Sequence, residues 1–195
     1  PTVAVTYNRN SSYGGNSTYN VSYSGDIAIP TSVVYNDTTY RVTSIGSYAF
    51  YYDRDVTSVT MPEGMKDIGA DAFCYCQKLK NVNIPSTVES INGYAFSNCD
   101  SLKSVILPEK MSSIGSNAFE SCNKLETVIL PDSLSMILDY TFNGCSNLRE
   151  ITLPAKLKSI GYSAFSGCSS LKKITALGVT PPTITSSYTL SGVPT

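Results

Sequence analysis

The same residue types return every 23 residues along this 195-residue chain. Isoleucine does so at Ile45, Ile68, Ile91, Ile114, Ile137 and Ile160. All six phenylalanines take the same step, at Phe50, Phe73, Phe96, Phe119, Phe142 and Phe165. Proline follows at Pro62, Pro85, Pro108, Pro131 and Pro154, and cysteine at Cys76, Cys99, Cys122, Cys145 and Cys168. A fixed period of roughly 20 to 50 residues is typical of a solenoid, in which short coils of chain stack on their neighbours.

One repeat unit can be translated into one coil. Residues 82–84 alternate between apolar and polar, which predicts a short strand with Val82 and Ile84 pointing inward and Asn83 outward. Pro85 lacks the N–H that a sheet ladder needs, so the strand should end there. The Ala–Phe segment that follows later is expected to form one turn of helix or 3₁₀ helix, with the ring inward. Several repeats have a glycine after the isoleucine that would permit a sharp bend, namely Gly69, Gly115 and Gly161.

No single coil of this kind buries enough apolar surface to be stable by itself. Stacked coils would place Leu on Leu and Phe on Phe, with a continuous core and a parallel sheet whose strands lie about 4.8 Å apart. We therefore expect a repeat solenoid with short parallel strands along one face and short strands or helical turns along the other.

Two segments of the repeat carry a resemblance to a known family. Residues 99–108, Cys-Asp-Ser-Leu-Lys-Ser-Val-Ile-Leu-Pro, and residues 114–119, Ile-Gly-Ser-Asn-Ala-Phe, are similar to the repeat unit of BspA-like leucine-rich repeat proteins. The resemblance implies an α/β-type leucine-rich repeat fold. It also implies secretion or display at the cell surface, since relatives are largely proteins of host-associated anaerobic bacteria and of some protists, and the characterised ones act as adhesins.

The chain is expected to divide into three parts. Residues 1–25 contain two alternating runs, Val3 to Tyr7 and Tyr19 to Tyr23, which predict a small N-terminal β cap over the open end of the stack. Residues 26–176 carry the BspA-like repeats, and the first repeat has nine extra residues that should form a hairpin loop. In residues 177–195 the repeat decays into a closing segment, whose last residues could be the start of a further coil.

Composition excludes several functional classes. Fourteen Lys and Arg against fifteen Asp and Glu give a net charge of −1, which lacks the basic footprint of nucleic-acid binding. With no histidine in the chain, general acid–base catalysis by His, His-dependent nucleophiles and His-ligated metals are excluded. No apolar run approaches the roughly 20 residues that span a bilayer, so we expect no membrane insertion by this segment. We expect no catalytic residue, no cofactor and no metal site.

The cysteines are interpreted as a packing ladder. Metal ligands must converge on one point, whereas equivalent positions in successive coils form a line about 4.8 Å apart. Buried, reduced thiols are the preferred interpretation, although a disulfide between ladder neighbours also fits that separation. Cys74 lies outside the period and is expected to be the most exposed cysteine. Asp53, which takes the cysteine position of its repeat, begins the run Asp53-Arg54-Asp55, interpreted as a solvated turn with a cation site as the alternative.

The outward strand positions offer the best candidate for partner binding. Ile106 and Ile129 would stand side by side on a polar surface, which is a feature of contact patches. The candidate partner-binding residues are Asn83, Ile106, Thr127, Ile129, Glu150 and Thr152. A neighbouring row is mostly positive and would favour an acidic partner, or else be a solvated face; it consists of Lys80, Lys103, Glu126, Arg149 and Lys172.

Tyrosine is a second lead, because nine of the fourteen tyrosines lie in residues 1–52. Tyrosine combines a large apolar face with a polar tip and suits contact surfaces. Packing of the N-terminal cap explains most of these tyrosines more simply.

The leading functional hypothesis is a non-catalytic, adhesin-like interaction module at the cell surface or outside the cell. It would bind a host or microbial protein or glycan through the repeat surface, without a cofactor. The alternative is a structural spacer that displays another domain. A carbohydrate-active enzyme is a third hypothesis, which would require a pocket with two facing carboxylates.

Overall fold

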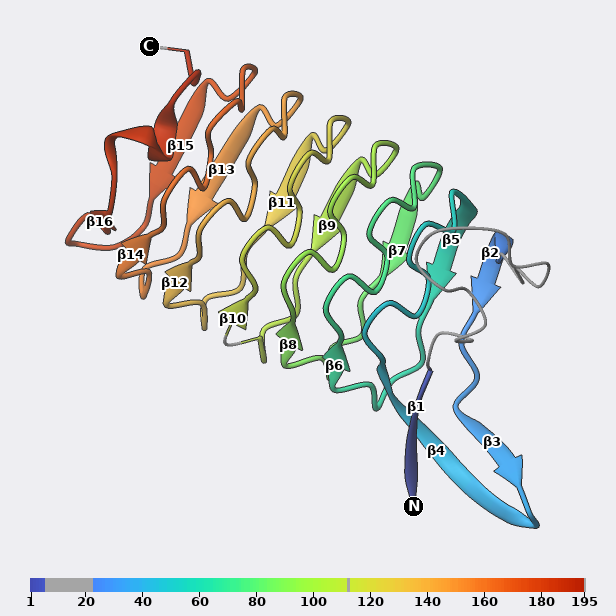
Figure 1. Ribbon diagram of the computed structural model, residues 1–195. Helices are drawn as coiled ribbons and strands as arrows, with labels where there is room; N and C mark the ends of the chain where they lie inside the picture. Colours follow the sequence, from blue (N-terminus) through green and yellow to red (C-terminus); the bar gives the residue numbers. More distant parts are fainter. Residues whose placement is uncertain (6–22, 112, 195) are drawn as a thin grey trace.

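The computed structural model describes residues 1–5, 23–111 and 113–194. The chain forms a stack of similar coils that runs from the N-terminal to the C-terminal part of the chain (Figure 1). Two rows of short parallel strands follow the stack. The predicted repeat solenoid is therefore confirmed.

The first row of strands forms a surface that we call the strand face. Its members are β2 (Ser24–Ala28), β5 (Asp55–Thr60), β7 (Asn81–Asn83), β9 (Ser104–Ile106), β11 (Thr127–Ile129), β13 (Glu150–Leu153) and β15 (Lys173–Ala176). In β9 and β11 the central valine is buried between two exposed residues, as expected when successive side chains point to opposite faces. The ladder is hydrogen-bonded within three groups: β2-β5-β7, β9-β11 and β13-β15.

The second row consists mostly of two-residue strands. Its members are β1 (Thr2–Val5), β4 (Thr38–Ile45), β6 (Asp67–Ile68), β8 (Ser90–Ile91), β10 (Ser113–Ile114), β12 (Met136–Ile137), β14 (Ser159–Ile160) and β16 (Thr183–Ile184). Ile45 pairs with Ile68, and Ile68 pairs with Ile91. The 23-residue period is thus the register of the ladder, and the isoleucines form a buried column.

The third side of each coil, which we call the turn face, leads from the second row back to the strand face. The prediction of a helical turn at the Ala–Phe segment is wrong. That segment forms turns, and the 3₁₀ helix within the described residues is η1 (Ser187–Leu190), after the repeats. The backbone N–H of Phe96 donates to the carbonyl of Ala118 in the next coil, with N···O 2.8 Å. In a helix this N–H would bind a carbonyl of the same segment, whereas here it joins two coils. Residues in the left-handed conformation, such as Tyr94 and Asn98 (both φ 58°), turn the backbone so that this hydrogen bond can form.

The glycines that follow the isoleucines permit close packing rather than a bend. Gly69 and Gly115 do not have a positive φ, so the predicted reason for them is wrong. A Cβ on Gly69 would lie 2.5 Å from the backbone nitrogen of Ser47 in the preceding coil, and one on Gly115 would overlap the backbone nitrogen of Gly93. Only glycine leaves room for adjacent backbones to approach this closely.

The core is a column of stacked phenylalanine rings. All six are fully buried, and neighbouring ring centroids lie 5.0–5.7 Å apart with interplanar angles of 5–12°. This spacing is close to the distance of about 4.8 Å between strands, so each coil contributes one ring to a continuous core.

At the N-terminal end, β1 lies parallel to β4 and extends the second row. The ring of Tyr23 lies 5.1 Å from that of Phe50 and covers the first member of the phenylalanine column. The rest of the predicted strand from Tyr19 and the polar segment before it lie outside the described residues, so the N-terminal β cap stays a prediction.

The nine extra residues of the first repeat form the predicted hairpin. β3 (Ser32–Tyr35) pairs antiparallel with β4, and the turn uses positive φ at Asn36 and Asp37. Figure 1 shows this hairpin projecting from the body of the stack.

After β15 the chain adds one more segment to the second row and one more to the turn face. β16 pairs with β14 in the second row, and the buried Thr189 of η1 accepts a hydrogen bond from the Phe165 N–H (2.9 Å) on the turn face. On the strand face, β15 is the last strand of the described residues. The closing role predicted for residues 177–195 stays a prediction.

Candidate interaction surface

The two isoleucines expected to be adjacent on the strand face are ladder partners. Ile129 pairs with Ile106 in the β9-β11 ladder, and the two residues expose 67% (Ile106) and 51% (Ile129) of their surface. Their inward neighbours, Val105 and Val128, are buried. The apolar pair is therefore not part of the core and faces solvent.

A groove adjoins this pair where the strand ladder is interrupted. β11 and β13 belong to different hydrogen-bonded groups, and a hollow of about 250 Å³ lies between them. Four of the candidate residues border it: Thr127, Ile129, Glu150 and Thr152. Ile106 lies on the adjacent strand, whereas Asn83 lies on β7, in another hydrogen-bonded group. The structure thus places four of the six candidates around the groove, with Ile106 on the next strand and Asn83 one strand further along the strand face (Figure 1).

Leu177 also borders the groove, and sequence reasoning missed it. This residue is 57% exposed and continues the ladder after β15, with its N–H bonded to the Leu153 carbonyl (3.0 Å). The sequence does distinguish Leu177, because the equivalent position of the preceding coil is Pro154 and the earlier coils also have proline there. A leucine in place of this proline marks an apolar side chain at the rim of the strand face.

The charged row beside the strands is partly neutralised. Arg149 Nη2 lies 3.5 Å from Glu126 Oε2. On the groove side, Glu150 and Asp132 add carboxylates. The surface around the isoleucine pair is consequently of mixed charge, and the predicted preference for an acidic partner is not reinforced there.

The cysteine column is a ladder of free, buried thiols, as predicted. The Cys99 Sγ donates to the carbonyl of Phe73 in the preceding coil at 3.2 Å. Equivalent bonds of 3.1–3.2 Å are made by Cys76, Cys122, Cys145 and Cys168. Burial raises the pKa of the Cys99 and Cys145 thiols well above the ordinary value, because the thiolate would have to be desolvated.

Two local predictions are corrected. Cys74, expected to be the most exposed cysteine, is buried, and burial raises the pKa of its thiol to about 12. Asp53, expected in a solvated turn, is also buried, and its Oδ1 accepts the Tyr23 N–H at 3.2 Å. The physical reason is that Asp53 takes the inward cysteine position, and the coil geometry keeps that direction whatever residue occupies it. Asp55 is exposed as expected and pairs with Lys78 (2.6 Å).

No group of three or more His, Cys, Asp or Glu side chains within residues 1–5, 23–111 and 113–194 is arranged to hold a metal ion. In the same part of the chain, none of the helical structure has the length and apolar character needed to cross a bilayer.

Comparison with known proteins identifies the repeat. A family described as "BspA type Leucine rich repeat region" matches residues 43–172 in six copies. The chain belongs to the BspA-type leucine-rich repeat family. No functionally curated protein matches this BspA-type chain.

Solved structures of bacterial leucine-rich repeat proteins share the fold of this BspA-type array. A leucine-rich cell surface protein from Faecalibacterium prausnitzii is 31% identical, with a TM-score of 0.72 over 86% of this chain and 51% of its own. A leucine-rich repeat protein from T. pallidum is 26% identical, with a TM-score of 0.76 over 87% of this chain and 78% of its own. The pneumococcal vaccine antigen PcpA is 27% identical, with a TM-score of 0.67 over 81% of this chain and 42% of its own. The chain thus spans about half the length of the F. prausnitzii protein.

Proposed function

We propose that this BspA-type array is a non-catalytic, adhesin-like module that binds a protein partner through the strand face, centred on Ile106 and Ile129. The observation that carries the proposal is the exposed apolar pair beside the groove between β11 and β13. Exposed apolar clusters rimmed by polar residues are typical of protein contact sites. Here the rim is formed by Thr127, Glu150 and Thr152.

The dimensions of the groove favour a protein over a small molecule. Its volume of about 250 Å³ is below the roughly 300–1,000 Å³ of most small-molecule sites. A hollow of this size suits one or two anchoring side chains of a partner, whose neighbours would then cover the isoleucine pair.

We further propose that the module acts at the cell surface or outside the cell. Support comes from the F. prausnitzii relative, which is described as a leucine-rich cell surface protein. The spacer hypothesis stays a prediction of the sequence.

A double substitution tests the strand-face proposal. Ile106→Asp with Ile129→Asp should abolish binding to the partner, because both charges would have to be desolvated in the interface. The control is Thr60→Asp, at an equivalent outward position of β5 on the same face. Binding would be measured by surface plasmon resonance against a panel of purified extracellular-matrix and serum proteins.

The outcomes separate the hypotheses. Loss of binding in the isoleucine variant alone, with unchanged circular dichroism, supports the proposed surface. A native chain that binds no panel member even at high micromolar concentration contradicts this proposal and favours the spacer. Equal loss in the Thr60→Asp control would mean that the charge effect is not local to the isoleucine pair.

A further inference from the structure

The turn face carries a row of tyrosines in alternate coils, which we call the tyrosine row. One left-handed position per coil lies directly before the buried residue at the Ala position of the Ala–Phe segment. Its successive occupants are Tyr48, Asp71, Tyr94, Asn117, Tyr140 and Ser163, with φ between 49° and 61°. In the last coil Tyr188 lies at the equivalent place in the hydrogen-bond pattern, although it is part of the 3₁₀ helix η1 and has no positive φ. The carbonyl of the following Thr189 accepts the Phe165 N–H just as the Ala164 carbonyl accepts the Phe142 N–H. Tyrosine and a polar residue thus alternate along the array.

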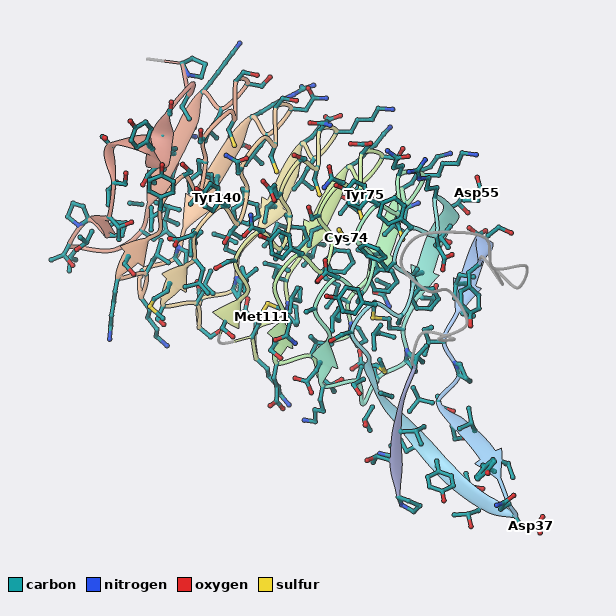
Figure 2. All side chains as sticks on the ribbon, viewed as in Figure 1. Asp37, Asp55, Cys74, Tyr75, Met111 and Tyr140 are labelled. Carbon is teal, nitrogen blue, oxygen red and sulfur yellow. The ribbon has the colours of Figure 1, made fainter. Side chains whose placement is uncertain are left out.

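The tyrosines recur at a regular distance. Phenylalanine rings of adjacent coils are 5.0–5.7 Å apart, so tyrosines in alternate coils recur about every 10 to 11 Å. Figure 2 shows Tyr140 between the two rows of strands, toward the C-terminal part of the stack.

The tyrosine rings are accessible. Tyr48, Tyr94 and Tyr188 expose 46%, 44% and 58% of their surface. Tyr140 is half-buried, but the exposed Tyr162 packs edge-on against it (5.3 Å) and contacts Tyr188 (5.7 Å). Three rings therefore form a continuous aromatic surface at the C-terminal end of the row.

Local backbone preference does not account for these tyrosines. The left-handed conformation is disfavoured for an L-residue with a bulky side chain, and Asn or Asp fits it better. Asp71 and Asn117 occupy the same position in the intervening coils, so the fold accepts the better residue. Tyr48, Tyr94 and Tyr140 keep this unfavourable backbone conformation outside the buried core, which indicates a role in binding.

The charged residues around the tyrosine row limit the chemical class of ligand that the row can bind. The first part of the turn face, up to the cysteine position, contains neither lysine nor arginine; in the six coils it spans residues 47–53, 70–76, 93–99, 116–122, 139–145 and 162–168. Basic residues follow in the second part, beginning with Arg54, whose guanidinium lies 5.1 Å from the centre of the Tyr52 ring. Carboxylates lie beside the row at Asp71, Glu120 and Asp139, all at least partly exposed. Around the tyrosines themselves there is thus no basic side chain of these segments to attract an acidic polymer, and the carboxylates can accept hydrogen bonds from hydroxyl groups.

We propose that the tyrosine row binds an extended, neutral β-1,4-linked glycan. The flat C–H face of a pyranose packs on a tyrosine ring, and the hydroxyls around its edge are left to the phenolic and carboxylate groups. An extended β-1,4-linked chain repeats after two sugars, and this repeat is close to two coils in length. A hexasaccharide thus matches the three intervals from Tyr48 to Tyr188. A polyproline II peptide, with a turn of about 9 Å, is the closest rival in spacing, but such peptides dock in aromatic-lined grooves, and the groove described above lies on the strand face.

The test compares hexasaccharides that differ in linkage. Isothermal titration calorimetry would measure binding of cellohexaose and chitohexaose, with maltohexaose as a neutral control whose α-linkage gives a coiled chain. Binding of either β-1,4 hexasaccharide, tighter than that of maltohexaose by about tenfold or more, supports the proposal. Failure of both, equal binding of maltohexaose, or binding of a decaproline peptide in their place overturns it.

Substitutions locate the site. Tyr94→Asn with Tyr140→Asn introduces the residue found at Asn117 in the same backbone conformation, so the fold should be retained while affinity falls about tenfold or more. The Phe variants at both positions keep the ring but lose the phenolic hydroxyl, so they should bind more weakly than the native chain but clearly more tightly than the Asn double variant. The control Tyr35→Asn changes an exposed tyrosine on the β3–β4 hairpin and should not alter binding. Unchanged affinity of the Asn double variant would overturn the proposal.

This site is independent of the strand face. The Ile106→Asp and Ile129→Asp variant should bind cellohexaose or chitohexaose as the native chain does. A failure of the glycan site would therefore leave the protein-binding proposal intact, and the reverse also holds.

Discussion

At the residue scale, the burial and hydrogen bonding of a side chain depend on the neighbouring coil. The thiol of Cys122 donates to the Phe96 carbonyl of the coil before it, and it is fully buried. Asp53 lies in the same column and is also buried, although its carboxylate is the kind of group that usually remains in water. Position in the coil therefore outweighs the polarity of the individual residue.

The buried thiols predict loss of stability at alkaline pH. Burial raises the pKa of Cys74 to about 12, from an ordinary value near 9, and raises the pKa of Cys99 and Cys145 as well. The contribution of the neutral thiols is thus fully present below about pH 9 and is lost as the pH rises toward the folded-state pKa. We expect the free energy of unfolding, measured with urea, to fall from about pH 9 upward, by up to about 1.4 kcal/mol per pH unit for each thiol.

A matched variant isolates the thiols from other groups that titrate in this range. Cys99→Ala with Cys145→Ala should be less stable than the native chain at about pH 8, because methyl groups fill the site less well, but its stability should fall less steeply above about pH 9. At about pH 8 the folded native chain should not react with a disulfide reagent. Rapid reaction of all six thiols without unfolding would contradict their placement.

At the element scale, strands of two or three residues persist because they pair with strands of neighbouring coils. β8 pairs with β6 and with β10, and backbone N–H groups of the turn face bind carbonyls of the next coil. Because these short elements hydrogen-bond to adjacent coils, the distance between neighbouring coils must be nearly constant along the stack. At Gly69, Gly115 and Gly161 the absence of a Cβ allows the backbones of adjacent coils to approach to that separation.

Substitution of one glycine should therefore destabilise the stack. In Gly115→Ala the new methyl group would overlap the backbone of Gly93, and we expect a loss of about 2 kcal/mol or more, because backbone atoms cannot move aside as a side chain can. Gly93→Ala is the control, since its Cβ would meet only the Ser116 carbonyl at 3.3 Å. Chemical denaturation would measure both, and an equal effect of the two substitutions would argue against the close approach of coils at Gly115.

At the scale of the whole molecule, stability is distributed along the array. Each coil contributes one ring to the phenylalanine column and contacts the coils before and after it. In such arrays stability is close to a sum over coils and the interfaces between them. Removal of one complete coil should then shorten the molecule without destroying it.

In-register deletion tests this view. Deletion of residues 101–123 removes one period and joins Asp100 to Lys124, so the pattern of the repeats continues. We expect a folded, less stable chain, shorter by about 5 Å, as measured by circular dichroism and small-angle scattering. Deletion of residues 101–111 breaks the register and should unfold the coils on either side. Similar behaviour of the two deletions would refute the repeat architecture.

Much of the fold could be predicted from periodicity. Equivalent residues share an environment, so the columns of Ile68 and Phe96 and the outward direction of Ile106 followed from spacing alone. The Ala–Phe turn did not, because a short apolar segment is compatible with a helical turn until the hydrogen bonds to the next coil are known. The burial of Cys74 did not either, because this residue has no cysteine counterpart in the other repeats.

For the candidate site, too, some features could be predicted from the sequence and others required the structure. The amino-acid sequence determined the register, and with it the adjacency of Ile106 and Ile129, because a fixed period in a stack of coils leaves one way to align them. Only the tertiary structure decided that a groove opens between β11 and β13, that Leu177 borders it, and that Tyr188 extends the tyrosine row. These features depend on how far adjacent coils separate and on how the last segment folds back, and such distances between coils are set by packing that no single repeat encodes.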